Sequence, residues 1–141
     1  MKQPSIFIIA VTVALFSALS CSTVPDPETV PQDLTVPELN RMAQEAIDNN
    51  NDKAAEVYYT LIIERFGSDP STLTAAEFEI AHIRVKNEKY ADAAQRLQII
   101  ISRYEATGGA GLPPEYLVLA RNDLAKVPSE HREKPGQPAA E

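Results

Sequence analysis

Two residues on one expected helix have the spacing of a metal site. Glu79 and His82 form Glu-x-x-His, and this spacing places a carboxylate and an imidazole on one side of a helix, as in di-iron helical bundles. Such a site needs a second copy of the pair and two more glutamates, whereas the other histidine, His131, has no glutamate three residues before it. We therefore expect no metal and no cofactor. We also expect no enzyme, because a Ser-His-Asp triad would lack any Gly-x-Ser-x-Gly context.

A second candidate for chemistry is the single cysteine, Cys21, which follows an apolar stretch near the N-terminus. Residues 6–19 contain only Thr12 and Ser17 as polar residues, and the positively charged Lys2 precedes them. The stretch is shorter than the roughly 20 residues that a membrane-spanning helix needs. It has the length of the apolar region of a secretory signal peptide, so residues 1–20 are predicted to be a signal peptide.

The residues Ala18-Leu19-Ser20-Cys21 resemble the lipobox of bacterial lipoproteins. The resemblance implies cleavage between Ser20 and Cys21 and attachment of a diacylglyceryl group to Cys21, with palmitate as an expected acyl chain. Ser22 in place of Asp after the cysteine favours the outer membrane by analogy with Gram-negative sorting. The alternative is an ordinary secretory signal followed by an incidental cysteine.

The charge balance limits the classes of partner. The 141 residues carry 13 Lys and Arg against 20 Asp and Glu, a formal net charge of −7. Nucleic-acid binding that is independent of sequence depends on Lys and Arg, so no nucleic-acid partner is expected. Anionic lipid would not attract so acidic a chain, and membrane attachment would come from the acyl chains on Cys21. One cysteine excludes an internal disulfide.

Composition divides the rest of the chain into three parts. Residues 21–36 are predicted to be a lipidated N-terminus and an extended linker, because prolines 25, 27 and 31 lie among polar residues. Residues 37–127 are predicted to be a helical domain. Residues 128–141 again combine prolines with polar residues and are predicted to be a disordered tail.

The domain is predicted to be all-α, with about five helices. A capping box of Thr35 and Glu38 would begin the first helix, and a second box of Thr74 and Glu77 would begin the third. Apolar residues recur at helical spacing between these signals and Gly108. The expected helices cover about 35–47, 54–66, 74–85, 90–104 and 114–126.

The second and fourth helices match when they are aligned with an offset of 38 residues. Ala55 then falls on Ala93, and the preceding helices place Ala43 on Ala81. This pattern resembles the tetratricopeptide repeat, in which small residues lie where paired helices cross. The run Phe-Glu-Ile-Ala at 78–81 and the closing Ile-Ile-x-x-Tyr at 100–104 are similar to the periplasmic type found in BamD and CpoB. The resemblance covers about residues 39–104 and implies a short superhelix of antiparallel helix pairs.

The resemblance implies a function without catalysis. We expect a membrane-anchored periplasmic lipoprotein that acts as a protein–protein interaction adaptor in an envelope complex for outer-membrane assembly or maintenance. The alternative is a small-ligand-binding protein or an accessory subunit of a transport, secretion or pilus system. Envelope proteins are the expected partners, and homo-oligomers are possible.

Two sets of residues are the predicted contact sites. The family's groove positions map onto Asn40, Gln44, Asp48, Phe78, His82, Lys86 and Arg121. The alternative for each is a solvated polar face, with Phe78 in the core. A hydrophobic contact with another chain is predicted at Tyr116, Leu117, Val118 and Leu119, because this apolar run places side chains on more than one face of a helix.

Overall fold

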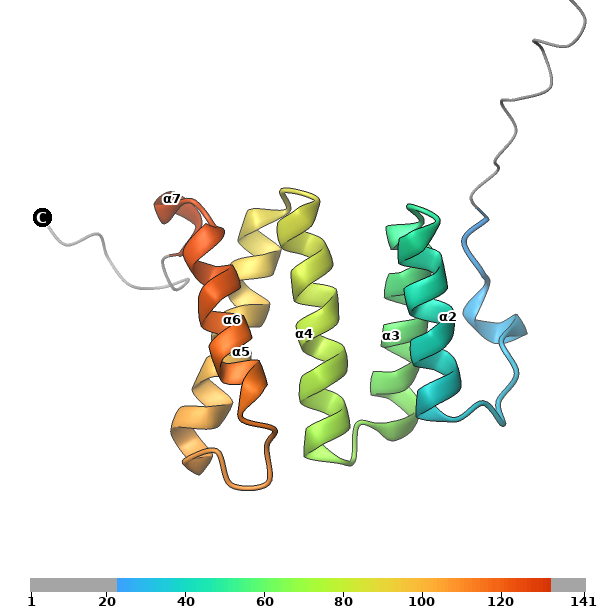
Figure 1. Cartoon of the computed structure of the whole chain (residues 1–141), viewed down its shortest axis with the longest axis horizontal. Coiled ribbons are helices and arrows are strands. Elements are labelled where there is room, and N and C mark those ends of the chain that lie inside the picture. Colours follow the sequence, from blue (N-terminus) through green and yellow to red (C-terminus); the bar gives the residue numbers. More distant parts are fainter. Residues whose placement is uncertain (1–22, 133–141) are drawn as a thin grey trace, which may run out of the picture.

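The computed structural model describes residues 23–132, and this part of the chain is all-α (Figure 1). Within that range there are no strands, so the predicted fold class is confirmed. The elements are η1 (Pro27–Thr29), α2 (Val36–Asp48), α3 (Asp52–Phe66), α4 (Pro70–Lys86), α5 (Tyr90–Thr107), α6 (Glu115–Lys126) and the short α7 (Ser129–Arg132).

Local sequence signals set several of the helix ends. The capping box of Thr35 and Glu38 begins α2, and the Thr35 backbone N–H donates to the Glu38 carboxylate at 2.8 Å. The Asn51 side chain accepts a hydrogen bond from the Ala54 N–H at 3.2 Å and begins α3. Gly108 ends α5 with φ of 62°, a left-handed conformation that glycine adopts without steric cost.

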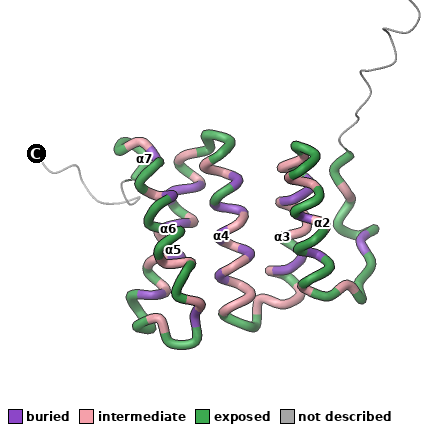
Figure 2. Tube along the Cα trace, viewed as in Figure 1, coloured by how far each residue is buried: buried purple, intermediate pink, exposed green. Residues whose placement is uncertain are grey.

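The helices form a row of antiparallel neighbours. Each of α2 to α5 packs against the next helix, and α6 also contacts α4. In Figure 1, α2, α4 and α6 lie on the near side, and α3 and α5 lie behind them. The helix α4 therefore has neighbours on both sides, and its buried residues lie between Thr74 and Ile83 (Figure 2).

Small residues allow the helices to approach closely. Ala43 of α2 and Ala81 of α4 are related by the offset of 38 residues, and both are fully buried, as is Ala120 of α6. Two groups of apolar side chains surround them. One joins α2, α3 and one side of α4 around Tyr59 and Ile62, and the other joins the opposite side of α4 to α5 and α6.

The turns after α2 and α4 have the same backbone geometry, at positions that differ by 38. Asn50 has φ of 55° and Glu88 has φ of 57°. The Asn50 N–H donates to the Ile47 carbonyl at 2.9 Å, and the Glu88 N–H donates to the Val85 carbonyl at 3.0 Å. The sequence offset thus corresponds to a repeated structural unit.

The start of the third helix differs from the prediction. Asp69 caps α4 by accepting from the Thr72 N–H at 2.9 Å, and Pro70 is the first helical residue, where its missing N–H costs nothing. The predicted start at Thr74 is therefore wrong. Thr74 is fully buried inside the helix, and its hydroxyl accepts from Arg103 at 2.8 Å.

The segment before α2 packs against the domain, which corrects the expectation of an extended linker. Val30 is buried in the core group of α2 and α3. Arg65 of α3 donates to the Pro31 carbonyl at 2.8 Å and to the Val30 carbonyl at 3.1 Å. The packed unit therefore begins before residue 37. Residues 1–22, with the predicted signal peptide and Cys21, lie outside the described residues.

The packed unit also extends beyond residue 127. The short helix α7 contacts α5, and the ring of His131 stacks on that of Tyr90 with centroids 5.9 Å apart. This contact corrects the predicted start of the tail at residue 128. Residues 133–141 lie outside the described part of the chain.

Candidate functional site

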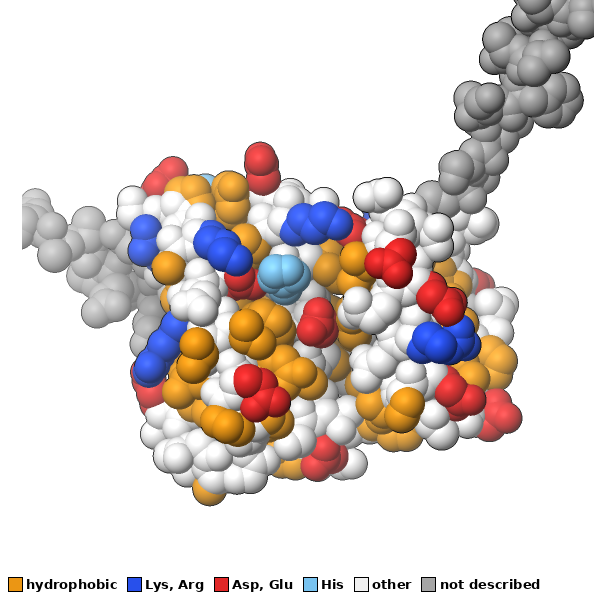
Figure 3. Space-filling model, viewed as in Figure 1, with side chains coloured by type: hydrophobic (Ala, Val, Ile, Leu, Met, Phe, Trp, Pro, Cys, Tyr) orange, Lys and Arg blue, Asp and Glu red, His pale blue; other side chains and the backbone are white. Residues whose placement is uncertain are grey.

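A groove of about 260 Å³ lies where α2, α4 and α6 come together. It is open to solvent, and α3 contributes Ile62 to its floor. Hydrophobic side chains gather over the lower parts of α4 and α6 on this face of the molecule (Figure 3). Its lining comprises Val36, Asn40, Ile62, Ser71, Thr72, Ala75, Ala76, Pro113, Glu115 and Tyr116.

A larger groove, of about 530 Å³, has a polar lining and lies at the turns that follow α2 and α4. Asn50, Asn51 and Lys89 are among its residues. The smaller groove is the better candidate site, because it joins residues from every second helix of the row and combines an apolar floor with a few polar groups.

The groove residues predicted on α2 have different surroundings. Asn40 is exposed and lines the groove. Gln44 is exposed one turn later, and its amide donates to the Tyr59 hydroxyl at 2.6 Å. Asp48 is exposed at the end of α2 and does not line the groove.

Phe78 belongs to the core, which corrects its predicted place in the groove. Its side chain is 5% exposed and lies in the group that joins α4 to α5 and α6. The ring packs against Tyr116 with centroids 5.5 Å apart. Because α4 has neighbours on both sides, it buries one stripe of side chains against α2 and α3 and another against α5 and α6. Phe78 lies on the stripe that faces α5 and α6.

His82 pairs with a carboxylate from the neighbouring helix. Its Nδ1 lies 2.5 Å from Oδ2 of Asp123, which is buried on α6, while the His82 side chain is about half exposed. Lys126 also reaches Asp123, at 2.7 Å. The pair links α4 to α6, and it gives His82 a structural partner at the edge of the near face.

Lys86 and Arg121 are exposed but do not line the groove. Lys86 reaches across to α3 and forms an ion pair with Asp52 at 3.1 Å. Arg121 follows Tyr116 by five residues, which rotates it by about 140° around α6. The groove prediction is therefore not supported at these two positions.

The predicted hydrophobic contact at 116–119 divides into two pairs. Tyr116 and Leu117 are half-buried and pack on the core group of α4, α5 and α6. Val118 and Leu119 are 59% and 41% exposed, among the most exposed large apolar side chains that the structure describes. The available apolar surface of α6 is thus smaller than the predicted contact of four residues.

The groove prediction missed most of the lining residues, among them Ser71, Thr72 and Glu115. Glu79 of α4 was not predicted either, and it does not line the groove. Glu79 is half-buried, and burial raises the pKa of its carboxyl group; His82 opposes this shift and Asp123 adds to it. The effect of Glu79 extends to two tyrosines. Burial and then Glu79 raise the pKa of Tyr59 to about 12, and the same two causes raise the pKa of Tyr116. Helical spacing from Ala75 would have placed Glu79 on the same side of α4.

Among the described residues, no group of three or more His, Cys, Asp or Glu side chains has the arrangement of a metal site. In the Glu-x-x-His pair, His82 is hydrogen-bonded to Asp123 of α6. Within residues 23–132, no helix has the length and apolar character needed to cross a membrane.

Comparison with known proteins gives one match. The chain is 40% identical over 115 residues to an uncharacterized protein of Treponema pallidum (strain Nichols). The matched region covers 82% of this chain and 46% of that protein, so the chain spans about half the length of its relative. No family model matches the chain, and no solved structure matches it.

Proposed function

We propose that this chain is a lipid-anchored adaptor of the bacterial envelope, of the tetratricopeptide type, that binds a partner protein in the groove of α2, α4 and α6. The observation that carries the proposal is the groove itself. It is open along one side and lined by residues from three alternate helices, which suits an extended segment of another protein better than an enclosed small ligand.

The exposed apolar pair Val118 and Leu119 supports a second contact on α6. These side chains are exposed, whereas the next residue, Ala120, is fully buried. The terminal helix of a repeat array usually has a polar outer face, so this pair is unusual for an end that only meets solvent. We propose that it adds to the interface with an envelope protein or with a second copy of this chain.

Photo-crosslinking in intact cells tests the adaptor role. A photoreactive residue at Asn40 in the groove is compared with one at Gln95, which is exposed on α5. We expect Asn40 to give a covalent adduct with one membrane-associated protein and Gln95 to give none. Adducts from neither position, together with a small molecule that copurifies with the protein, would favour the ligand-binding alternative.

The anchor is tested separately. Cys21→Ala should abolish labelling by a palmitate analogue and release the protein from the membrane fraction, whereas Ser22→Ala should leave both unchanged. Continued labelling of the Cys21 variant would refute lipidation at this residue.

A further inference from the structure

All four lysines of the described residues lie at one end of the row of helices, and all are exposed. Lys53 is in the first turn of α3, Lys86 ends α4, and Lys126 ends α6. Lys89 immediately precedes α5. Because neighbouring helices are antiparallel, these positions share one edge of the row, the upper edge in Figure 1, with the turns after α2 and α4. We call this edge the lysine end.

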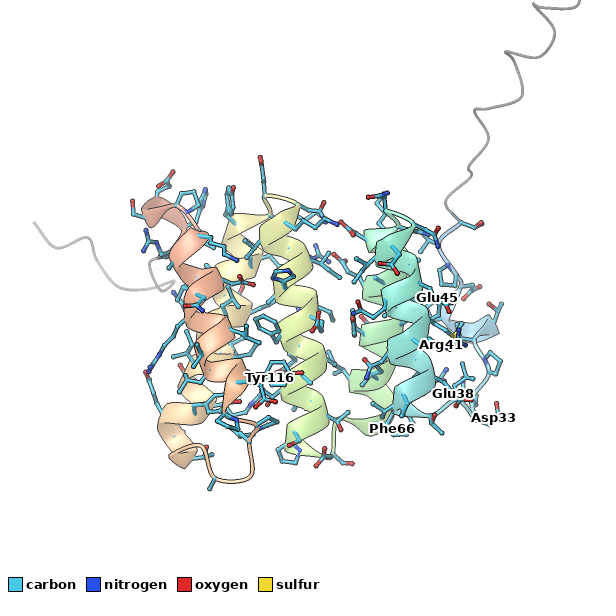
Figure 4. The ribbon with its side chains drawn as sticks, viewed as in Figure 1. Asp33, Glu38, Arg41, Glu45, Phe66 and Tyr116 are labelled. Carbon is cyan, nitrogen blue, oxygen red and sulfur yellow. The ribbon has the colours of Figure 1, made fainter. Side chains whose placement is uncertain are left out.

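The opposite end of the row is acidic. Figure 4 shows Asp33 and Glu38 there, and none of the described lysines lies at that end. Its arginines, Arg65 and Arg103, are half-buried and bound within the domain. At the lysine end, by contrast, lysines offset the nearby acids. The exposed acidic residues of the opposite end are Asp33, Glu38, Asp69, Glu105 and Glu115.

Two of the lysines have no acidic partner in the domain. Lys53 and Lys89 form no ion pair with any described residue. Both line the polar groove of about 530 Å³. The unpaired charge of that groove is therefore positive, because its acidic lining residues are each bound to a cation of the domain, Asp52 to Lys86 at 3.1 Å and Glu56 to Arg84 at 2.5 Å.

The first described residues are held at this same end. The side-chain amide of Asn51 donates to the Thr23 carbonyl at 3.1 Å, while its oxygen accepts from the Ala54 N–H. Val24 lines the polar groove, and its side chain is 45% exposed. The chain then reaches the core at Val30. Thr23 therefore has a defined place beside the turn after α2.

The short separation between Thr23 and Cys21 limits how far the domain can lie from a bilayer. Two residues span at most about 7 Å. The headgroup layer on each side of the hydrocarbon core is about 5–8 Å thick. A lipid on Cys21 would therefore hold Thr23, and with it the lysine end, at the level of the headgroups. Lysine ammonium groups at that level donate to lipid phosphates.

We propose that the lysine end of the domain lies on the phospholipid surface, with Lys53 and Lys89 bound to lipid phosphates and the helices directed away from the membrane. This inference rests on the proposed lipid anchor at Cys21 and adds a headgroup contact and an orientation. Helices of 13 to 18 residues would place the opposite end about 20–27 Å from the surface. The groove of α2, α4 and α6 lies towards that end and stays accessible, because Thr72 and Glu115 are in the first turns of their helices.

Short-range quenching of a fluorescent label tests the orientation. The full-length lipidated protein is reconstituted into vesicles of phosphatidylethanolamine and phosphatidylglycerol that include a lipid with a nitroxide on its headgroup. Cys21 is the single cysteine and carries the lipid, so an introduced cysteine takes the label alone. Asn49→Cys places the label in the turn after α2, and Ser68→Cys places it in the turn after α3; both residues are exposed. We expect quenching to be at least about twofold stronger at position 49, because a helix length of about 20 Å separates the two ends.

Charge variants test the headgroup contact. Each lysine near an anionic surface should change the population of the docked orientation by about fivefold. Lys53→Gln combined with Lys89→Gln should therefore lower the quenching at position 49 towards the value at position 68. Arg121→Gln is the control, because Arg121 is also an exposed cation without an ion pair but lies in the middle of α6. It should leave the quenching unchanged. Circular dichroism of each variant checks that the helical fold is kept.

Three results would overturn the inference. Quenching that is equal at the two positions, or stronger at position 68, would show that the lysine end does not face the bilayer. Quenching at position 49 that survives the double lysine variant would exclude the contact of Lys53 and Lys89 with phosphates. Protein that lacks the palmitate label and does not sediment with the vesicles would overturn the anchor as well. The first two results leave the anchor in place, so failure of the orientation and failure of the anchor are distinguishable.

Discussion

The place of Phe78 gives the sharpest test of the fold, because a groove residue and a core residue respond differently to truncation. Phe78 is 5% exposed, packs on Tyr116 and belongs to the same core group as Leu97 and Ile100. Truncation of a buried Phe to Ala costs about 3–5 kcal/mol through lost transfer energy and the cavity that remains. The free energy of unfolding of a domain is about 5–15 kcal/mol, so this loss is a large fraction of it.

The measurement is urea unfolding of the full-length protein in mild detergent, followed by circular dichroism. We expect Phe78→Ala to lower the free energy of unfolding by about 3–5 kcal/mol and Phe78→Leu, which keeps most of the volume, by less than about 1.5 kcal/mol. Leu119→Ala is the control, because Leu119 is 41% exposed, and its loss should stay below about 1 kcal/mol.

The order of the three variants decides the question. If Phe78→Ala costs no more than Leu119→Ala, Phe78 is not in the core and the packing described between α4 and α6 is wrong. If it costs the expected amount, loss of partner binding in that variant reflects unfolding and says nothing about a groove contact.

Four further outcomes follow from the same packing. Because burial raises the pKa of Glu79 above its ordinary value of about 4.5, ionisation of this carboxyl group opposes folding once the pH rises above that value. Glu79→Gln should therefore raise Tm at pH 7, and the gain should shrink as the pH falls towards about 4.5 and be absent below it; an equal gain at all pH values would contradict this. Ultraviolet titration at high pH should show a tyrosine that ionises near pH 12 and is absent from Tyr59→Phe; an unchanged curve would assign that ionisation to another residue. Leu119→Glu should reduce crosslinking to the partner if the partner is another protein, or shift a dimer to a monomer in light scattering if it is a second copy. Helix content should not change. A variant that behaves as wild type in both assays would show that α6 is not part of the interface. Gly108→Ala should lower the free energy of unfolding by about 1–2 kcal/mol, as measured by thermal unfolding, because Gly108 has φ of 62°. No atom lies within 4 Å of an added Cβ, so the cost comes from the backbone conformation alone. An unchanged stability would contradict the left-handed end of α5.

Much of the fold could be predicted because its signals are local. The Thr35 capping box, the Asn51 cap and the glycine after α5 each act on the adjacent turn through backbone hydrogen bonds. Helical spacing of apolar residues then gave α2, α3 and α5, each of which has one dominant buried side. The all-α class and the buried alanines followed from the same information.

The start of α4 and the residues that line the groove could not be predicted from local sequence patterns. Thr74 and Glu77 have the types of a capping box, but in the folded chain Arg103 of α5 contacts both, at 2.8 Å and 2.7 Å. The pair therefore serves a contact between helices. Asp69, which lies next to a proline, provides the actual cap.

The sequence alone determined the helices, their caps and the small residues at their crossings, because these depend on neighbours within a few positions along the chain. Tertiary structure decided how far α4 is rotated about its axis, because that rotation is the compromise between burying one stripe against α3 and another against α5 and α6. This rotation places Phe78 in the core and leaves Glu79 half-buried, with no ion pair among the described residues. Packing also decided that the segment around Val30 lies on α3, since its contacts come from Arg65, more than thirty residues away.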